Sequence, residues 1–257
     1  MGKLEVKEED FCPVCGKAKS RTLFILGTMQ TFHVLCDCES RKREEDEEER
    51  KHREFMQTIA QNRSAGFAEK KMLECTFAND DGKGGRAMQI CRDYAENFEK
   101  FKKADKGLLL YGTVGNGKTY MAAAIMNHLI DQGRRCLMTN LSRIINQMWE
   151  ESDKNAYLDS LASYELLVID DYAAERNTDY VNDIVFQVID ARYRSGLPLI
   201  MTTNLSEEEL TRPKDIAKNR IYSRIFEMCF PIKVIGADRR TKGLRNAESQ
   251  FNDIMNS

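Results

Sequence analysis

The sequence lacks any long hydrophobic run. In its 257 residues no apolar stretch approaches the roughly 18 residues that a helix needs to cross a bilayer. Residues 1–11 are largely charged and contain no hydrophobic segment of the kind found in secretory signals. We therefore exclude membrane-spanning and secreted proteins, and expect a cytoplasmic protein with no membrane partner.

An excess of charge of one sign is also missing. The chain has 39 Lys and Arg residues against 41 Asp and Glu residues, a formal net charge of −2. This balance argues against a protein whose whole surface binds polyanions, although it is compatible with a local basic patch. The three histidines have no matching serine or cysteine constellation, so nothing indicates acyl-transfer chemistry.

Cysteine, in contrast, is plentiful near the N-terminus. Four of the eight cysteines lie within the first 38 residues: Cys12, Cys15, Cys36 and Cys38. The first pair is spaced as in a zinc knuckle, with Gly16 permitting the tight turn, and the second pair completes four thiolate ligands. The second pair encloses one residue rather than two, so His33 stays open as an alternative ligand. We predict that residues 1–40 form a zinc-binding module that docks a partner, the alternative being reduced thiols without metal.

A run of charged residues follows this module. Asp46 and Arg50, Glu47 and Lys51, and Glu49 and Arg53 each place an acid four residues before a base, the order that stabilises a helix. We expect a solvated helix that continues through Gln61 and leads into a glycine-containing linker. Residues 41–84 are thus predicted to be a charged helical arm and linker.

The remaining chain, residues 85–257, alternates short apolar runs with helical patterns. Strands are expected at 107–111, 136–139, 166–169, 199–203 and 232–235, and helices at 86–103, 119–132, 142–150, 179–195 and 214–228. Strands that are apolar throughout and separated by helices are typical of a buried parallel sheet. We predict an α/β domain with a parallel five-stranded sheet and helices on both faces.

The strongest functional signal is GTVGNGKT at residues 112–119, a complete GxxxxGK[ST] phosphate-binding loop between a strand and a helix. Gly115 and Gly117 let backbone N–H groups face phosphate, Lys118 neutralises the β- and γ-phosphates, and Thr119 ligates Mg²⁺. The alternative is a glycine turn that binds nothing. The predicted ATP contacts are Gly112, Thr113, Val114, Gly115, Asn116, Gly117, Lys118, Thr119 and Tyr120.

Two later strands also end in polar residues. Asp170 fits a Walker B aspartate that holds Mg²⁺, and Asp171 stands where many P-loop ATPases have a glutamate that polarises the attacking water. Asn204 is a candidate to orient that water and sense the γ-phosphate. Alternatively, the acids cap a strand and Asn204 opens a turn. The strand at 136–139 separates the two Walker motifs in the chain, as in P-loop proteins whose Walker strands are not adjacent.

Arginines on the helix near residues 216–228 suggest contact with a neighbouring subunit. Arg220 and Arg224 are four residues apart and therefore share one helix face. We favour Arg224 as an arginine finger that completes the nucleotide site of a second copy, against an ordinary surface role. Arg239 and Arg240 are weaker candidates for contacts with phosphate or nucleic acid.

Four segments resemble the DnaC/DnaI/IstB-type AAA+ ATPases in their order and spacing, over roughly residues 62–240. They are GLLLYGTVGNGKT, LLVIDD, IMTTN and RIYSRI. The resemblance implies a P-loop ATPase that loads a ring-shaped, hexameric replicative helicase during replication initiation and binds single-stranded DNA. It also implies that Arg224 is the arginine finger and Asn204 is sensor 1. The cysteine module resembles the part of DnaI-type loaders that grips the helicase. Asp171 is one methylene shorter than the usual glutamate, so we expect slow hydrolysis.

Two other functions fit parts of this pattern. A transposition helper ATPase of the IstB kind would bind duplex DNA and a transposase, and an adaptor would keep a degenerate ATP site. The intact lysine, threonine and acids count against the adaptor. The cysteine module favours the loader over the transposition helper, because it suits the docking of a protein partner.

Overall fold

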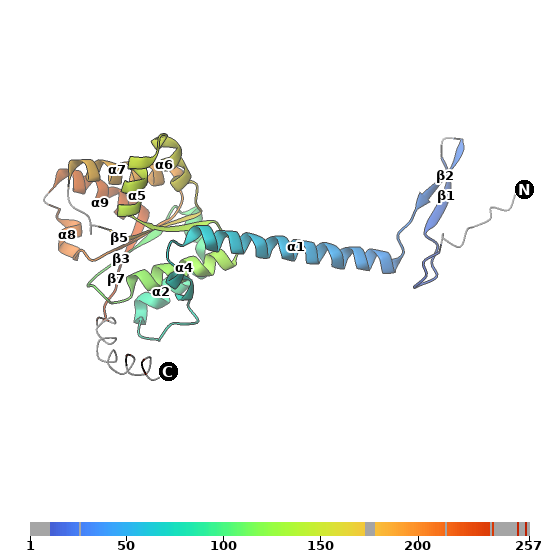
Figure 1. Cartoon of the computed structure of the whole chain (residues 1–257), viewed down its shortest axis with the longest axis horizontal. Coiled ribbons are helices and arrows are strands. Elements are labelled where there is room, and N and C mark those ends of the chain that lie inside the picture. The colour runs from blue at the N-terminus through green and yellow to red at the C-terminus, as the bar shows by residue number, and fades with distance from the viewer. Residues whose placement is uncertain are drawn as a thin grey trace, which may run out of the picture. The chain divides into compact units, whose positions relative to one another are not determined.

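The computed structural model describes residues 11–25, 27–172, 178–213, 215–236, 238, 251 and 255. The chain divides into two compact units, Met1–Gln57 and Thr58–Ser257 (Figure 1). The division falls inside a helix, α1, which runs from Asp37 to Gly66.

The first unit contains an antiparallel hairpin of strands β1 (Ser20–Ile25) and β2 (Thr28–His33). The strands pair from Ser20 opposite His33 to Ile25 opposite Thr28, and Gly27 permits the reversal with a φ of +82°. Most of the hairpin's side chains are exposed. Among the described residues of this unit, only Cys12 and Cys36 are buried, so an apolar core is absent from this part of the structure.

The charged run forms the helix that its pattern predicts. Arg50 pairs with Glu47 and with Glu54 at 2.7 Å, and Arg53 pairs with Glu49 at 3.4 Å. The helix begins earlier and ends later than expected, at Gly66 rather than near Gln61. Asn62, which already belongs to the second unit, donates to the carbonyl oxygens of Gly133 and Arg134, and this tertiary contact holds the last helical turn.

The second unit is built on a parallel five-stranded sheet, which confirms the predicted fold class. The strand order is β4-β5-β6-β3-β7. The strands are β3 (Gly107–Tyr111), β4 (Cys136–Asn140), β5 (Leu166–Tyr172), β6 (Leu199–Thr203) and β7 (Cys229–Lys233). The two Walker strands, β3 and β5, are separated in the sheet by β6, the strand that precedes Asn204.

The last strand begins three residues and ends two residues earlier than predicted. Its apolar pattern indicated 232–235, but pairing with β3 sets Cys229 opposite Gly107 and Ile232 opposite Leu110. Val234 then donates its N–H to the carbonyl of Tyr111. The hydrogen-bonding partner strand, rather than local hydrophobicity, therefore fixes where β7 begins and ends.

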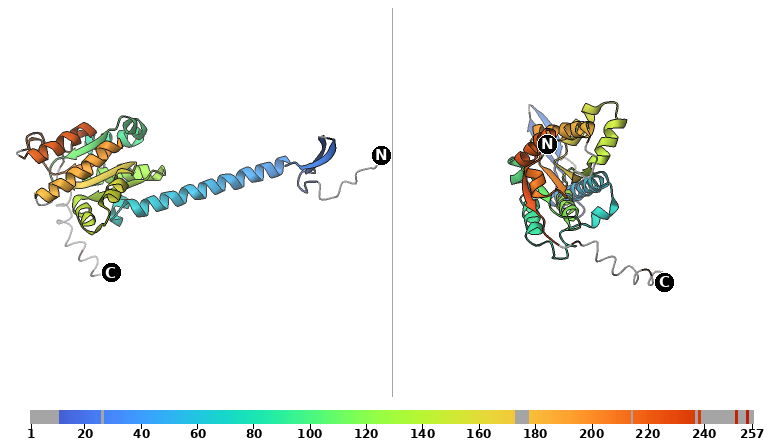
Figure 2. Two further views of the ribbon diagram at one scale, coloured as in Figure 1. Left: turned by 90° about the horizontal axis from the view of Figure 1, so that it is seen from above. Right: turned by 90° about the vertical axis from the view of Figure 1, so that its left-hand side faces the viewer.

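Helices cover both faces of the sheet, as predicted (Figures 1 and 2). On one face α2 and α4 enclose one apolar cluster with β3 and β5, and on the other α5, α6, α7 and α9 enclose a second. None of the helices in the described part of the chain has the length and apolar character to cross a membrane. The helices are α2 (Gly85–Glu96), α3 (Phe98–Lys103), α4 (Lys118–Asp131), α5 (Leu141–Glu150), α6 (Lys154–Ala162), α7 (Asp179–Ser195), α8 (Glu207–Thr211), α9 (Ile216–Met228) and a 3₁₀ helix, η2 (Lys70–Glu74).

Candidate functional site

The phosphate-binding loop connects the carboxyl end of β3 to the start of α4. It closes around the ammonium group of Lys118, which is 7% exposed. Lys118 Nζ donates to the carbonyl oxygens of Gly112 at 2.8 Å and Thr113 at 2.7 Å, and to Asn116 Oδ1 at 3.2 Å. The loop therefore places a cation beside the N-terminal end of α4, where the helix dipole also favours an anion.

The chain after β7 packs against this loop. Asn116 donates its side-chain N–H to the carbonyl of Val234. A Cβ atom on Gly112 would lie 2.5 Å from that same carbonyl oxygen, and one on Gly115 would lie 1.8 Å from Asp238 Oδ1. These two glycines are required for close packing as well as for their positive φ angles of +137° and +78°.

The acids predicted from the sequence meet the loop at the sheet edge. Thr119 Oγ1 donates to Asp170 Oδ1 at 2.9 Å, and Asn204 Nδ2 donates to Asp171 Oδ1 at 2.8 Å. Burial raises the pKa of the Asp170 carboxyl, while the hydroxyls of Thr202 and Thr119 that donate to it act in the opposite direction. A hydroxyl and a carboxylate in contact are the oxygen ligands that Mg²⁺ accepts beside a nucleotide.

A cavity of about 450 Å³ joins these elements, within the range of small-ligand pockets. It is lined by residues 114–120 of the loop, by Asp170, Asp171, Thr202 and Asn204, and by Lys71, Met72 and Cys75. Of the predicted ATP contacts, Gly112 and Thr113 do not line the cavity but supply the carbonyls that bind Lys118. The structure thus brings residues 114–120, the two acids Asp170 and Asp171, and Asn204 together around one cavity.

The sequence did not predict that η2 lines this cavity, because residues 62–84 have the composition of a linker. Asn127 of α4 donates to the carbonyls of Met72 and Cys75, both at 2.8 Å. Tyr120 donates its hydroxyl to the carbonyl of Thr76 at 2.7 Å. A polar Asn127 inside the apolar pattern of α4 was the one signal that this segment is held against the helix.

Arg220 and Arg224 share one face of α9 but do not line the cavity. Their guanidinium carbons lie 4.7 and 4.5 Å from the ring centre of Phe186 in α7. Arg224 also forms an ion pair with Asp190 and lies 5.6 Å from the ring centre of Tyr193. Arg224 is therefore engaged within its own chain. Arg239 and Arg240 lie outside the described residues.

A family model described as IstB-like ATP binding protein matches residues 40–247, most of the chain. The chain belongs to the IstB-like ATP-binding protein family. This agrees with the resemblance drawn from the sequence and with the P-loop AAA+ fold.

The chain is also similar to two replicative helicase loaders. It is 27% identical over 165 residues to the replicative helicase loader DnaI of Bacillus subtilis, covering 59% of this chain and 53% of that protein. It is 30% identical over 131 residues to the replicative helicase loader DnaC of Escherichia coli K12, covering 49% and 52%. A crystal structure of DnaI superposes with a TM-score of 0.56 and 27% identity, over 68% of this chain and 95% of that one. The chain spans about half the length of these curated relatives.

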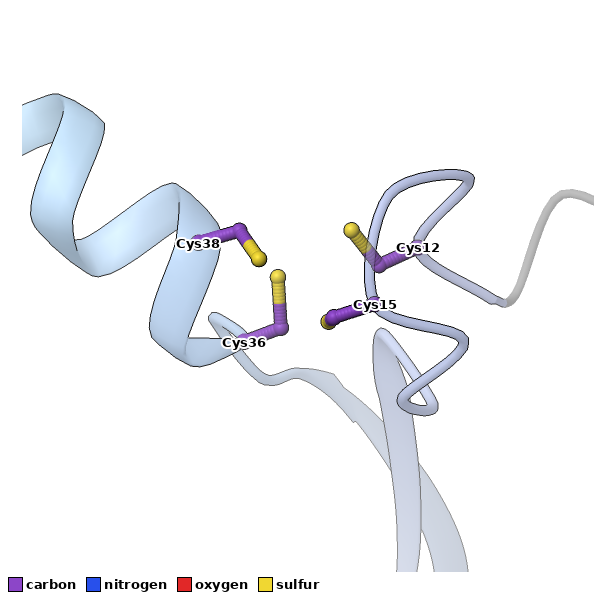
Figure 3. Close-up of side chains that lie close together, drawn as sticks. All are labelled: Cys12, Cys15, Cys36 and Cys38. Atoms are coloured by element: carbon purple, nitrogen blue, oxygen red, sulfur yellow. The ribbon is translucent and has the colours of Figure 1, made fainter.

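The thiol cluster lies before the part of the chain that the IstB-like family model matches. The Sγ atoms of Cys12, Cys15, Cys36 and Cys38 all lie within 4.8 Å of one another. Figure 3 shows them converging from two segments, a loop before β1 and the start of α1. A tetrahedral zinc ion with Zn–S bonds of about 2.3 Å needs sulfurs about 3.8 Å apart, so small side-chain rotations suffice and the donor set fits zinc. The alternative ligand His33 pairs with Ser20 in the hairpin and is not in this group.

Backbone geometry shapes the first turn of the thiol cluster and favours the thiolate of Cys12. Gly16, with a φ of +67°, closes the first turn by donating its N–H to the carbonyl of Cys12 at 2.8 Å. The N–H groups of Cys15 and Val14 lower the pKa of Cys12 to about 7, which makes its thiolate available near neutral pH. Lys19 pairs with Glu39 at 2.6 Å and ties the two segments together.

Proposed function

We propose that the protein binds ATP with Mg²⁺ in the cavity beside the loop and hydrolyses it. Lys118 would bind the β- and γ-phosphates together with the loop amides, and Thr119 and Asp170 would hold the metal. The ion would draw charge from the phosphate oxygens. The observation that carries the proposal is the contact of Thr119 with Asp170 beside the buried Lys118, because a turn with no ligand needs neither.

In this proposal Asp171 and Asn204 act on the attacking water. The carboxylate of Asp171 would orient the water and accept its proton, and the amide of Asn204, which donates to that carboxylate, would fix its direction. Aspartate is one methylene shorter than glutamate, so its carboxylate reaches less far into the cavity. We therefore expect slow hydrolysis.

We further propose that this ATPase loads a ring-shaped, hexameric replicative helicase onto single-stranded DNA in the cytoplasm, at the initiation of replication. Support comes from the DnaI and DnaC loaders to which the chain is similar. Copies of the chain would associate through the nucleotide site, with Arg224 contacting the nucleotide of a neighbour. That contact requires Arg224 to leave Asp190, so the ion pair would oppose assembly until nucleotide is bound.

In this proposal, successive segments of the chain have different roles. Residues 1–40 would bind zinc and dock the helicase. Residues 41–84 would connect this module to the ATPase domain and, through η2, line its cavity. Residues 85–257 would form the ATPase domain itself. The hairpin offers apolar side chains to a partner: Leu23, Phe24, Met29 and Phe32 are 44%, 70%, 60% and 41% exposed. Exposed apolar side chains gathered in one small element are typical of a protein-binding surface.

Co-purification distinguishes this role from transposition. The full-length zinc-loaded protein would be mixed with the hexameric replicative helicase of the cell in which it occurs or with an IS21-type transposase, each with ATP–Mg²⁺ and with EDTA. We expect a stable complex with the helicase and none with the transposase. Association with the transposase alone would reject the loader and favour the IstB-type transposition helper, for which the family match is the supporting observation.

A further inference from the structure

The two acids at the end of β5 lie in an irregular part of the sheet. β5 pairs regularly with β6 as far as Ile169 opposite Met201, and pairing resumes at Tyr172 opposite Thr203. Asp170 and Asp171 therefore both stand opposite the single residue Thr202, as in a β-bulge. Asp171 has a φ of +54°, a left-handed conformation that residues other than glycine seldom adopt.

The bulge changes where the second acid points. In a regular strand, successive side chains point to opposite faces of the sheet. Asp170 and Asp171 are consecutive, yet both line the cavity beside the phosphate-binding loop. The irregular backbone thus places the metal-holding candidate and the water-orienting candidate in one site.

Thr202 connects the two acids through one hydroxyl. Its Oγ1 donates to Asp170 Oδ1 at 2.6 Å and accepts the backbone N–H of Asp171 at 2.9 Å. The side chain is 1% exposed, so water does not compete for these bonds. The N–H of Asp171, displaced from the regular ladder by the bulge, has a side-chain acceptor instead of a strand carbonyl.

We propose that Thr202 is a positioning residue for ATP hydrolysis. It holds the bulge at Asp171, so that the Asp171 carboxylate faces the attacking water, and it fixes one oxygen of Asp170. The inference rests on the proposed ATPase function and adds to it a residue with no predicted role. Without the hydroxyl, the N–H of Asp171 loses its partner and the left-handed backbone loses the bond that stabilises it.

The neighbouring Thr203 provides a matched control. Its Oγ1 donates to the carbonyl of Tyr172 at 2.9 Å and accepts the N–H of Leu205 at 3.2 Å, and the side chain is fully buried. Thr203→Val therefore removes a buried hydroxyl with the same pattern of one donated and one accepted bond, on the same strand, without touching either acid.

The test compares Thr202→Val, Thr202→Ser and Thr203→Val with the wild-type protein for ATP affinity and for kcat. We expect Thr202→Val to lower kcat about ten- to a hundredfold, the effect of losing hydrogen bonds around a charged group. The dissociation constant for ATP should change less than about threefold, because ground-state contacts of the loop are kept. Thr202→Ser, which keeps the hydroxyl, should restore kcat, and Thr203→Val should keep it.

A Thr202→Val variant with the kcat of the wild-type protein would overturn the proposal. So would an equal loss of kcat in Thr203→Val, which would show that any buried hydroxyl on β6 matters. If the wild-type protein neither binds nor hydrolyses ATP, the proposed function fails, and a crystal structure of Thr202→Val then decides the positioning role. Asp171 leaving the left-handed conformation would support it, and an unchanged bulge would overturn it.

Discussion

The two units of the molecule bury very different side chains. In the described part of the first unit only Cys12 and Cys36 are buried, whereas the second unit encloses two apolar clusters around its sheet. So short a segment buries too little apolar surface to fold alone. We therefore expect the first unit to need metal to fold, and the second, with its two apolar clusters, to fold without a ligand.

Removing metal should have the largest effect and should separate the two units. Structural zinc supplies about 10–16 kcal/mol of apparent binding free energy in small domains, so chelation should unfold the first unit and leave the second folded. Limited proteolysis of the full-length protein, with and without a strong chelator, should show cleavage confined to the segment before α1. Metal analysis should find about one zinc per chain.

Two cysteine variants test whether the zinc is bound by the thiol cluster. Cys12→Ser should lose zinc, whereas Cys75→Ser, outside the thiol cluster, should keep it. A purified protein without zinc, or a first unit that resists proteolysis after chelation, would contradict the contrast between the two units.

Truncating a leucine should matter in one unit and not in the other. Leu110 of β3 is fully buried, so Leu110→Ala should lower the free energy of unfolding by about 2–5 kcal/mol. Leu23 of β1 is 44% exposed, and Leu23→Ala should change stability by less than about 0.5 kcal/mol. Thermal denaturation followed by circular dichroism measures both, and similar losses would mean that the hairpin has a core of its own.

A smaller loss than that of Leu110→Ala is expected at the exposed apolar side chains of the hairpin, which we propose bind the helicase. Phe24→Ser should weaken binding to the helicase about tenfold, as at a single interface residue of moderate weight, with no change in the melting temperature. Phe55→Ser, on an exposed part of α1, is the control and should bind normally. Titration of the labelled helicase gives both affinities; equal binding by Phe24→Ser would remove the hairpin from the proposed interface.

Local patterns predicted the parts of the fold that local forces determine. The apolar runs predicted four strands closely, and the glycine pattern predicted the phosphate-binding loop. The cysteine spacing predicted a cluster of thiols, whose Sγ atoms lie within 4.8 Å of one another in the structure. The extension of α1 to Gly66 and the position of β7 depend on contacts with distant residues, which local periodicity does not contain. Both differences follow from tertiary pairing, through Asn62 and through β3.

In the candidate site, the residues that belong to recognisable motifs could be predicted. The residues that hold them in position could not. Asp170 and Asp171 follow an apolar strand and are visible in the sequence, but the bulge between them depends on the side chain of Thr202 from another strand. The η2 residues that line the cavity lie in a segment whose apolar residues show no helical or strand periodicity. Asp238 approaches Gly115 across the fold, and no spacing in the sequence relates the two.

Calorimetric titration of ATP–Mg²⁺ into the wild-type protein and Lys118→Ala tests the central claim most directly. Lys106→Ala, at the opposite end of β3, is the control for removing a lysine near the same strand. We predict binding of about one nucleotide per chain by the wild-type and Lys106→Ala proteins, and none by a folded Lys118→Ala. An affinity in Lys118→Ala equal to that of the wild-type protein would contradict the account.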